Sequence, residues 1–463
     1  MPDQIETYVE TAMDQVRWKK ARPGLAAEIR THLLDQRDAC LAQGMDEGAA
    51  QGEAVRQMGD PVALGTDLDR VHRPRPQWGL LVFALALAAL GTLVRLVLTM
   101  NTPIETPLVH IMGGVLGAVC LAAGYLLDVS ALGRRAGCVC LGFLAVTIPC
   151  AISIPSVISM LNSMNLTGWI IGSFLIQTLF PLTLALLLWR LRGRGWLGVL
   201  GGLVWTGLAV FQCIILFNGS ALFYVTISAL VLGLFFAYQN WFGIGKKLGT
   251  VLVTLLGLGV LFLIVYYWYW RQFRFDIHPE LDPLNQGYYA AAIRTALSGA
   301  KWLGPVDPAL WFTENGWPLV PNIEGDNLLT NLICSWGWLP FLAVVGAFAA
   351  FFLWMLWKTL RLRQTLGRAV CLGGLTALGV QAVFSLLLNL GVPLFAASFP
   401  LVVGNTGTVL NMFLIGLMLS AFRDGAMPEE QPGAVGRTRR TLPAVSWADG
   451  VLTVDFKGRT VSE

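Results

Sequence analysis

The sequence predicts an all-α polytopic membrane protein, in which about ten transmembrane helices follow a small soluble helical domain. Of its 463 residues, 55% are hydrophobic and only 13% are charged, against roughly 25% charged in a soluble protein. The charges crowd into the first 75 residues, the last 40 and a few short loops, and the apolar runs between them reach 18 residues or more. Such runs can cross a hydrocarbon core of about 30 Å, and they should be helices, because a helix satisfies its own backbone in lipid.

Residues 1–75 are predicted to form a separate cytoplasmic domain of four short helices. Pro23 is typical of a helix start and Gly44 of a helix end, while Asp46 and Asp60 stand where helix caps are expected. The first helix should bury one face, because apolar residues repeat there at helical spacing. These residues are Ile5, Val9, Met13 and Val16.

A membrane domain is expected at 76–425, after the basic, Pro-rich stretch 72–76, and a polar cytoplasmic tail at 426–463. Within the tail, alternating residues around Asp449-Gly450 predict a short hairpin. The expected spans are 78–99, 107–127, 136–159, 168–190, 195–217, 220–240, 246–269, 327–357, 368–391 and 405–422.

The loop charges predict the orientation, since Arg and Lys collect on the cytoplasmic side of a membrane. Basic clusters follow the even-numbered spans, whereas the loops after the first, third, fifth and ninth spans contain neither residue. The clusters are Arg134-Arg135, Arg190-Arg192-Arg194, Lys246-Lys247 and Lys358-Arg361-Arg363-Arg368. The sequence therefore predicts that both termini are cytoplasmic and that one large loop, 270–326, is external.

The net charge, the surroundings of the cysteines and the placement of the carboxylates argue against nucleic-acid binding, a metal site and ion-coupled transport, respectively. The net charge of +4 is small and spread over loops, so no nucleic-acid partner is expected. Cys138 and Cys140 have no partner pair or histidine nearby, which favours packing residues over a metal site. No Asp or Glu lies in the middle of a span, whereas transporters place ion-binding carboxylates at the membrane midplane.

The external loop carries residues suited to a phosphate-bearing lipid. Residues 266–270 form an aromatic belt, and 288–303 predict an amphipathic helix lying on the membrane. Arg294 and Lys301 are seven residues apart and should share a face of that helix. Two cations there suit the diphosphate of a lipid carrier. The alternative is simple interfacial anchoring by snorkelling.

Asp326 lies where the external loop re-enters the membrane. A carboxylate at that boundary is costly unless it is used or hydrated. Like-charge repulsion from Glu324, two residues away, would weaken Asp326 as an acid and suit it to act as general base on a sugar hydroxyl. The alternative is a helix N-cap, because Asp326 directly precedes an apolar helix.

Further polar residues stand within the expected spans. Arg95 and His110 lie near outer ends and are interpreted as snorkelling side chains. Gln177 and Gln381 are deeper and are interpreted as bridges between helices. The remaining two are Asn331 and Asn389.

Four local motifs follow one another in the order of a known family. Residues 168–194 are similar to its segment R-W-I-x-[IL]-G-x-F-x-[FI]-Q-P-S-E, through Trp169, Gly172 and Gln177. Residues 271–304 are similar to R-x-x-x-F-L-D-P-x-x-D-P-x-x-x-G-Y-Q and a following helix, through Arg271, Asp282-Pro283, Gly287-Tyr288 and Gly304. Residues 321–337 are similar to P-E-x-H-T-D-F-I-F-A-x-x-x-E-E-x-G, through Pro321, Asp326 and Gly337. The last match comprises Gln381, Gly391, Pro393 and Pro400.

With ten spans and one large external loop after the seventh, the chain resembles the SEDS family (shape, elongation, division and sporulation; the FtsW, RodA and SpoVE proteins) over about residues 80–423. The resemblance implies a peptidoglycan glycosyltransferase of cell division, cell shape or sporulation. It would polymerise undecaprenyl-diphosphate-linked precursor at the outer face of the bacterial plasma membrane. Asp326 would be the catalytic base, and the substrate would be bound by Arg271, Arg294, Lys301, Trp169, Gln177 and Gln381.

The resemblance also implies a transpeptidase as protein partner and allows a divalent cation, Mg²⁺ or Mn²⁺, at the diphosphate. Departures from the motifs keep a second hypothesis open, a non-catalytic relative that acts as a membrane scaffold or lipid-handling protein. Thr178-Leu179-Phe180 replaces Pro-Ser-Glu, Asn322 replaces a Glu, Cys334-Ser335 replaces a Glu pair, and 403–408 replaces Ser-Tyr-Gly-Gly-Ser-Ser. Residues 1–75 resemble the permease-prefix helical domain of diverse Firmicute membrane proteins, which implies protein contacts inside the cell.

Overall fold

Most of the described residues are helical, which confirms the predicted all-α class. In residues 163–171 and in the two strands near the C-terminus, the backbone alone is described. The computed structural model describes residues 4–19, 21–72, 76–99, 107–152, 163–216, 218–268, 273–313, 318–320, 325–394, 396–400, 405–424, 444–448 and 451–455.

The first four helices bury a shared apolar core. They are α1 (Gln4–Gln15), α2 (Arg22–Ala42), α3 (Glu47–Met58) and α4 (Pro61–His72). Asp46 begins α3, where its Oδ2 accepts the Ala49 N–H at 3.3 Å. Gly59 ends α3 with a φ of +83°, a conformation that suits glycine. The predicted face of the first helix lies in the core, with at most 7% exposure at Ile5, Val9, Met13 and Val16.

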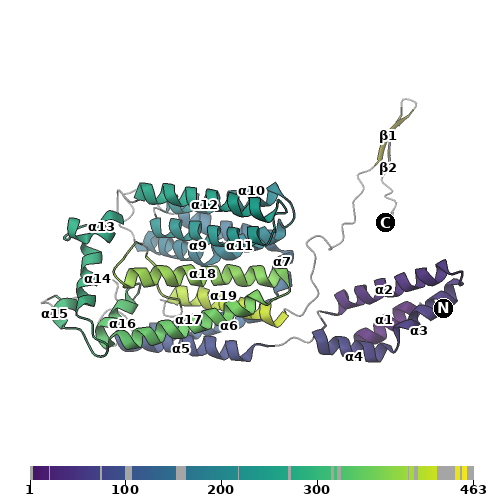
Figure 1. Cartoon of the computed structure of the whole chain (residues 1–463), viewed down its shortest axis with the longest axis horizontal. Coiled ribbons are helices and arrows are strands. Elements are labelled where there is room, and N and C mark those ends of the chain that lie inside the picture. The colour runs from purple at the N-terminus through teal and green to yellow at the C-terminus, as the bar shows by residue number, and fades with distance from the viewer. Residues whose placement is uncertain are drawn as a thin grey trace. The chain divides into compact units, whose positions relative to one another are not determined.

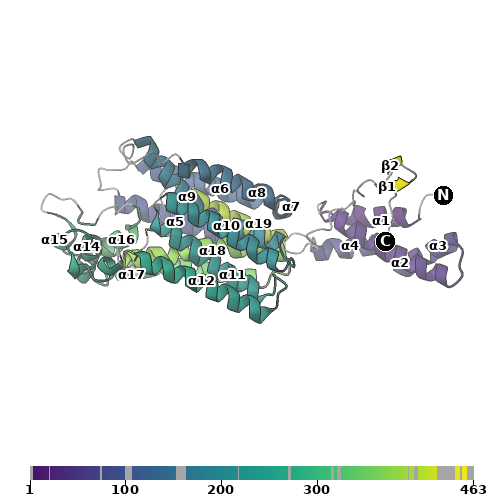
Figure 2. The same ribbon diagram turned by 90° about the horizontal axis from the view of Figure 1, so that it is seen from above.

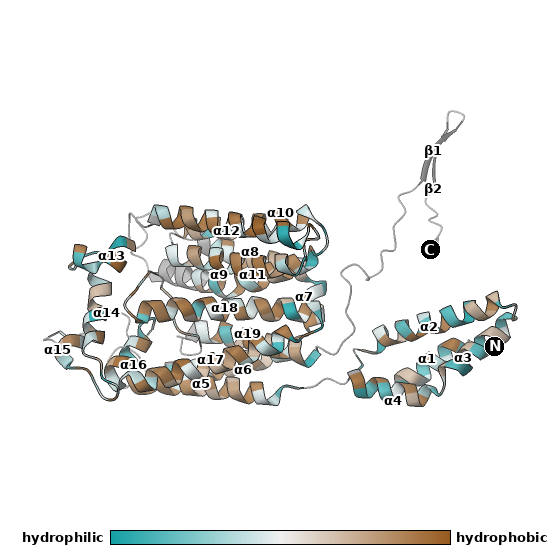
Figure 3. Ribbon diagram, in the orientation of Figure 1, coloured by the Kyte–Doolittle hydropathy of each residue, from teal (hydrophilic) through white to brown (hydrophobic). Residues whose placement is uncertain are grey.

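A helix lies at each of the ten expected spans. These helices are α5 (Trp78–Thr99), α6 (Pro107–Leu126), α8 (Ala136–Ile152), α9 (Ser163–Arg190), α10 (Trp196–Ile215), α11 (Gly219–Tyr238), α12 (Lys246–Trp268), α17 (Trp338–Leu360), α18 (Thr365–Asn389) and α19 (Asn405–Asp424). Among the described residues, seven helices are long and apolar enough to cross a membrane, and two shorter apolar helices accompany them. Hydrophobic residues follow the long helices throughout (Figure 3). These helices suggest a multi-pass membrane protein.

The long helices lie side by side, and shorter elements gather at their two ends (Figures 1 and 2). At one end, here called the loop end, lie α13 (Arg274–Ile277), η3 (Pro279–Leu281), α14 (Tyr288–Ser298), α15 (Pro308–Trp311) and α16 (Leu328–Trp336). The other end, called the basic end, carries α7 (Val129–Arg134). The turns after α9 and α11 meet there, since the Gly193 N–H donates to the Trp241 carbonyl at 2.7 Å.

The helices differ in how deeply they lie in the bundle. Nearly three quarters of the apolar stretches of α9 and α18 are buried, at 72% each. By contrast, only 6% of the stretch in α12 is buried, because α12 packs mainly against α11. The core of the bundle therefore lies around α9 and α18, while α12 stands at its edge (Figure 1).

The predicted eighth span, 327–357, is wrong at its start, because Gly337 separates α16 from α17. Gly337 has a φ of +100°, and a Cβ there would come within 2.7 Å of the Trp302 carbonyl oxygen. Segment 301–304 lies against this break, and its Lys301 carbonyl accepts the Trp338 N–H at 3.0 Å. The apolar run is thus continuous in sequence, but its helix is interrupted by a close backbone approach that only glycine permits.

A second compact unit begins at Pro428 and contains a hairpin. Its strands, β1 (Ala444–Ala448) and β2 (Val451–Asp455), pair antiparallel with Ala448 opposite Val451. The connecting residues, Asp449-Gly450, lie outside the described residues.

Candidate active site

Asp326 lies at the loop end, in the turn that leads into α16. Its Oδ1 accepts a hydrogen bond from the Ser398 hydroxyl at 2.5 Å. Its main-chain carbonyl accepts another from Asn389 Nδ2 at 2.8 Å. The half-buried carboxylate is therefore oriented by the segment between α18 and α19, and its backbone is tied to the end of α18.

Asn389 organises this part of the structure. The side chain is fully buried at 0% exposure, and its Oδ1 accepts from the Thr330 N–H at 2.8 Å and from the Thr330 hydroxyl at 2.9 Å. Its Nδ2 also donates to the Ser385 carbonyl at 2.8 Å. One amide thus joins the first turn of α16 to the last turn of α18, as polar side chains between membrane helices commonly do.

Gln381 supports the same carboxylate indirectly. It is 6% exposed in α18, and its Nε2 donates to the Ser398 carbonyl at 3.0 Å. Ser398 is in turn the residue that donates to Asp326. The structure therefore brings two residues that the sequence singled out, Asp326 and Gln381, to either side of one serine.

The N-cap position of α16 is occupied by Asn327, whose side chain makes no cap hydrogen bond. Asn327 Nδ2 instead donates to the Tyr289 hydroxyl of α14 at 2.6 Å. Burial raises the pKa of Tyr289 to about 12, the negative charge of Asp326 adds to the rise, and the Asn327 hydrogen bond opposes it. Tyr289 is therefore a weaker acid than an ordinary tyrosine, and it lies close to the turn that carries Asp326.

Arg294 binds carbonyl groups of three loop-end residues. Its Nε donates to the Gly391 carbonyl at 2.9 Å, and its two terminal nitrogens donate to Asp276 and Ile277 at 3.0 and 3.1 Å. A guanidinium has five N–H donors, so these bonds engage three of them. Arg294 therefore holds α14 to the ends of α13 and α18.

Lys301 does not share a helical face with Arg294, contrary to the prediction of a helix over 288–303. Helix α14 ends at Ser298, and Lys301 is exposed in the segment beyond it. The helix stops because the following backbone pairs with the end of α16. The Gly304 N–H donates to the Trp336 carbonyl at 3.0 Å, and the Val306 N–H donates to the Cys334 carbonyl at 2.8 Å.

Of the remaining predicted site residues, only Gln177 has a described side chain, and no described contact joins it to Asp326. Gln177 is half-buried in α9. Trp169 belongs to α9, but its side chain lies outside the described residues, as do Arg271 and Glu324. In the described part of the chain, no three His, Cys, Asp or Glu side chains are grouped so that they could hold a metal ion.

Sequence reasoning missed Ser398, which binds Asp326, and also Thr330 and Tyr289, which bind Asn389 and Asn327 beside it. Asn389 was noticed only as a polar residue inside a span. The one available signal for Ser398 was its place between Pro393 and Pro400, in the last motif match. Nothing in the local pattern showed that this hydroxyl points at a carboxylate 72 residues away in the sequence.

Comparison with known proteins identifies the fold. No family model matches this chain, and no curated protein matches it. A solved structure does match, a chain from work described as the structural coordination of polymerization and crosslinking by a peptidoglycan synthase complex. The two share 16% identity with a TM-score of 0.55, over 76% of this chain and 98% of that chain. The membrane bundle described above therefore has the fold of a chain in a peptidoglycan synthase complex.

Proposed function

We propose that this chain is a SEDS-like peptidoglycan glycosyltransferase that polymerises undecaprenyl-diphosphate-linked precursor. The fold shared with a chain of a peptidoglycan synthase complex supports this proposal at the level of the pathway. At the level of a single residue, the proposal rests on the carboxylate of Asp326, which is fixed by hydrogen bonds and stands at the position predicted from the motif match. Ser398 orients one carboxylate oxygen, and Asn389 fixes the backbone of the same residue.

The proposed reaction joins two lipid-linked sugars. The hydroxyl oxygen of the acceptor attacks the anomeric carbon of the donor, and a new carbon–oxygen bond forms there. The bond from that carbon to the diphosphate breaks, and the diphosphate leaves with its lipid. Asp326 takes the hydroxyl proton as general base. Ser398 orients the carboxylate proposed to receive the proton through its hydrogen bond to Oδ1.

The diphosphate needs positive charge, since phosphate is bound most strongly by cationic donors. Lys301 is exposed at the loop end and, with Arg271, is the proposed contact. Arg294 commits three donors to carbonyl groups, so its proposed part is to position α14. A divalent cation would also neutralise a diphosphate. The described residues around Asp326 supply no second carboxylate to hold one, and no step of the proposal depends on it.

The proposed location is the bacterial plasma membrane, with both termini in the cytoplasm and the loop end outside. The clustering of basic turns at the opposite end supports this orientation, because Arg and Lys prefer the cytoplasmic side. The proposed protein partner is a transpeptidase, in line with the crosslinking named for the similar complex.

One observation favours a second candidate function, a non-catalytic scaffold or lipid-handling protein. Cys334 stands where the family motif has the first residue of a Glu pair. Its side chain is 2% exposed and packs in an apolar cluster with Ile293 and Leu388. A site that lost such a carboxylate could keep its fold while losing activity.

Polymerisation of lipid-linked precursor by the purified protein separates the two candidates. We expect glycan polymer from the wild type and at least a 100-fold lower rate from Asp326→Asn, since general-base catalysis contributes roughly 100- to 10,000-fold. Asp307→Asn is the matched control, because Asp307 caps α15 at the same end through the Ala309 N–H at 3.0 Å. Full activity in Asp326→Asn would contradict the general-base role of Asp326. No polymer from the wild type under any partner condition would favour the scaffold.

A further inference from the structure

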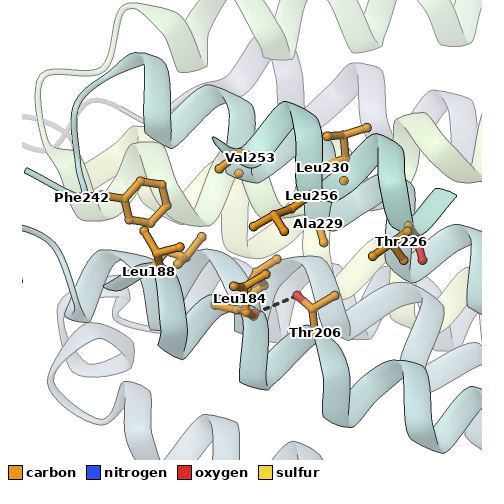
Figure 4. A pocket seen from close by; sticks show the side chains of 15 residues that line it. Leu184, Leu188, Thr206, Thr226, Ala229, Leu230, Phe242, Val253 and Leu256 are labelled. Atoms are coloured by element: carbon orange, nitrogen blue, oxygen red, sulfur yellow. Dashed lines mark hydrogen bonds between the residues drawn. The ribbon is translucent and has the colours of Figure 1, made fainter. Parts of the chain in front are cut away.

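An apolar cavity of about 150 Å³ lies in the half of the bundle nearer the basic end, between α9, α10, α11 and α12. Figure 4 shows its lining, which includes Leu184 and Leu188 of α9, Val253 and Leu256 of α12, and Phe242. The hydroxyl groups of the two threonines labelled in the figure already donate hydrogen bonds to backbone carbonyls. Thr206 donates to the Gly202 carbonyl at 2.8 Å, and Thr226 to the Leu222 carbonyl at 2.9 Å. Such a space attracts an apolar guest and not water.

The cavity is partly open, and two of the helices that line it, α10 and α12, are among the less buried helices of the bundle. Helices α10 and α12 both pack against α11, and the stretch of α12 is only 6% buried. Side chains of α12 beside the cavity face outward, with 67% exposure at Leu255. In a membrane, the exposed side of α12 meets lipid, which places acyl chains next to the helices that line the cavity.

Two basic turns stand at the basic end of this cavity, and their cations are here called the basic mouth: Arg192, Arg194, Lys246 and Lys247. The turns 190–196 and 238–247 contain no Asp or Glu. They are tied together by the hydrogen bond from the Gly193 N–H to the Trp241 carbonyl at 2.7 Å. Next to Trp241 in the chain is Phe242, which is 5% exposed and lines the cavity.

Aromatic rings set the positions of two of these cations. The Arg192 guanidinium lies 5.4 Å from the centre of the Trp241 ring, and the Lys246 ammonium lies 6.0 Å from the Tyr238 ring. Trp241 is itself held by stacking on Phe236 at 4.4 Å. Cations on such rings remain charged and able to meet an anion. The basic mouth is therefore a cationic surface, positioned in part by aromatic rings, that adjoins the apolar cavity.

We infer that this place binds an anionic phospholipid, with its phosphate at the basic mouth and part of one acyl chain in the cavity. Charge complementarity selects the class of lipid, because basic pockets between membrane helices bind anionic headgroups. The cavity selects a lipid over a free phosphate, because only a lipid fills both parts. This site is at the opposite end of the bundle from Asp326, and the inference is independent of the proposed enzymatic function.

The test measures stabilisation of the full chain, purified in a neutral detergent, as dioleoylphosphatidylglycerol is titrated. We expect saturable stabilisation by this lipid, much weaker stabilisation by dioleoylphosphatidylcholine, and none by inorganic phosphate at the same concentration. Equal effects of phosphate and phosphatidylglycerol would overturn the role of the cavity. Equal effects of the two lipids would overturn the role of the basic mouth.

Variants make the test specific. Arg194→Gln with Lys247→Gln should raise the half-saturating phosphatidylglycerol concentration roughly tenfold or more, since each cation near an anionic lipid contributes appreciably. Arg134→Gln with Arg135→Gln removes the same charge from the same end, away from the cavity. This pair should change the half-saturating phosphatidylglycerol concentration little. Equal shifts in both pairs would show a general charge effect and overturn the site.

Filling the cavity tests the acyl chain separately. Ala229→Leu places a larger side chain in the space drawn in Figure 4 and should weaken phosphatidylglycerol binding while leaving the basic mouth intact. Val251→Leu is the matched control, because Val251 is 54% exposed on α12 and is not part of the lining. Unchanged lipid binding in a folded, monodisperse Ala229→Leu protein would contradict the inference.

Discussion

The two ends of the membrane bundle use polar residues in opposite ways. At the loop end, polar groups bind one another: Asn389 contacts Thr330 and Ser385, and Arg294 donates to three carbonyl groups. At the basic end, the turns after α9 and α11 carry cations without a single acidic residue. At the loop end, the polar groups therefore fix the positions of side chains and backbone. At the basic end, the cations create a positive electrostatic potential. Substitutions at the loop end should therefore displace neighbouring groups, whereas substitutions at the basic end should mainly alter the local charge.

The largest expected effect is all-or-none and tests whether the two ends face different sides of the membrane. In a background without native cysteines, Ser298→Cys at the loop end should react with an impermeant thiol reagent in intact cells. Gln239→Cys at the basic end should react only after lysis. Both side chains are exposed. Reversed labelling would overturn the proposed orientation, and labelling of both in intact cells would show that the ends are not separated by a membrane.

Next in size is the effect of Ser398 on the proposed reaction. Ser398→Ala removes the hydrogen bond to Asp326 Oδ1 and leaves the carboxylate in place. Because a misplaced catalytic group costs up to roughly 100-fold in rate, we expect kcat for polymerisation to fall about 10- to 100-fold with KM nearly unchanged. Ser220→Ala is the control, since Ser220 accepts the Ala396 N–H of the same segment at 2.9 Å without touching Asp326. An equal loss in both variants would make Ser398 merely structural.

Asn389→Leu should show that the loop end depends on internal hydrogen bonds. The substitution leaves the Thr330 N–H without its partner, and each buried polar group left unsatisfied costs roughly 1–3 kcal/mol. The free energy of unfolding in mixed micelles measures this loss. Arg194→Gln at the basic end should stay within about 0.5 kcal/mol of the wild type, as exposed substitutions usually do. Similar losses at both ends would remove the contrast between them.

The last prediction compares two glycines, Gly337 directly before α17 and Gly346 within it, and its smallest expected effect is at Gly346. Gly337→Ala should destabilise the protein by about 1–3 kcal/mol, because its φ of +100° is a strained conformation for alanine. Gly346→Ala, in the helix with open space around its Cβ position, should instead stabilise by roughly 0.5–1 kcal/mol. Thermal unfolding of the two variants shows whether each substitution raises or lowers the stability of the protein. A stabilised Gly337→Ala would mean that the break before α17 is not a tight backbone contact.

The local sequence was sufficient for the helices. Apolar runs of span length predicted a helix at each of the ten expected positions, because inside lipid each stretch must satisfy its own hydrogen bonds. The buried face of α1 followed from the spacing of Ile5, Val9 and Met13 in the same local way. These properties depend on neighbours a few residues apart, so one sequence is enough to predict them.

Only the tertiary structure decided where the polar side chains at the loop end go. Arg294 was predicted to face a diphosphate, yet it donates to the Gly391 carbonyl, 97 residues away. Asp326 meets Ser398 across 72 residues, and the run 327–357 breaks at Gly337 because segment 301–304 lies against it. A polar group binds whichever complementary group folding brings within about 3 Å. That proximity is a property of the packed chain and leaves no periodic trace in the sequence.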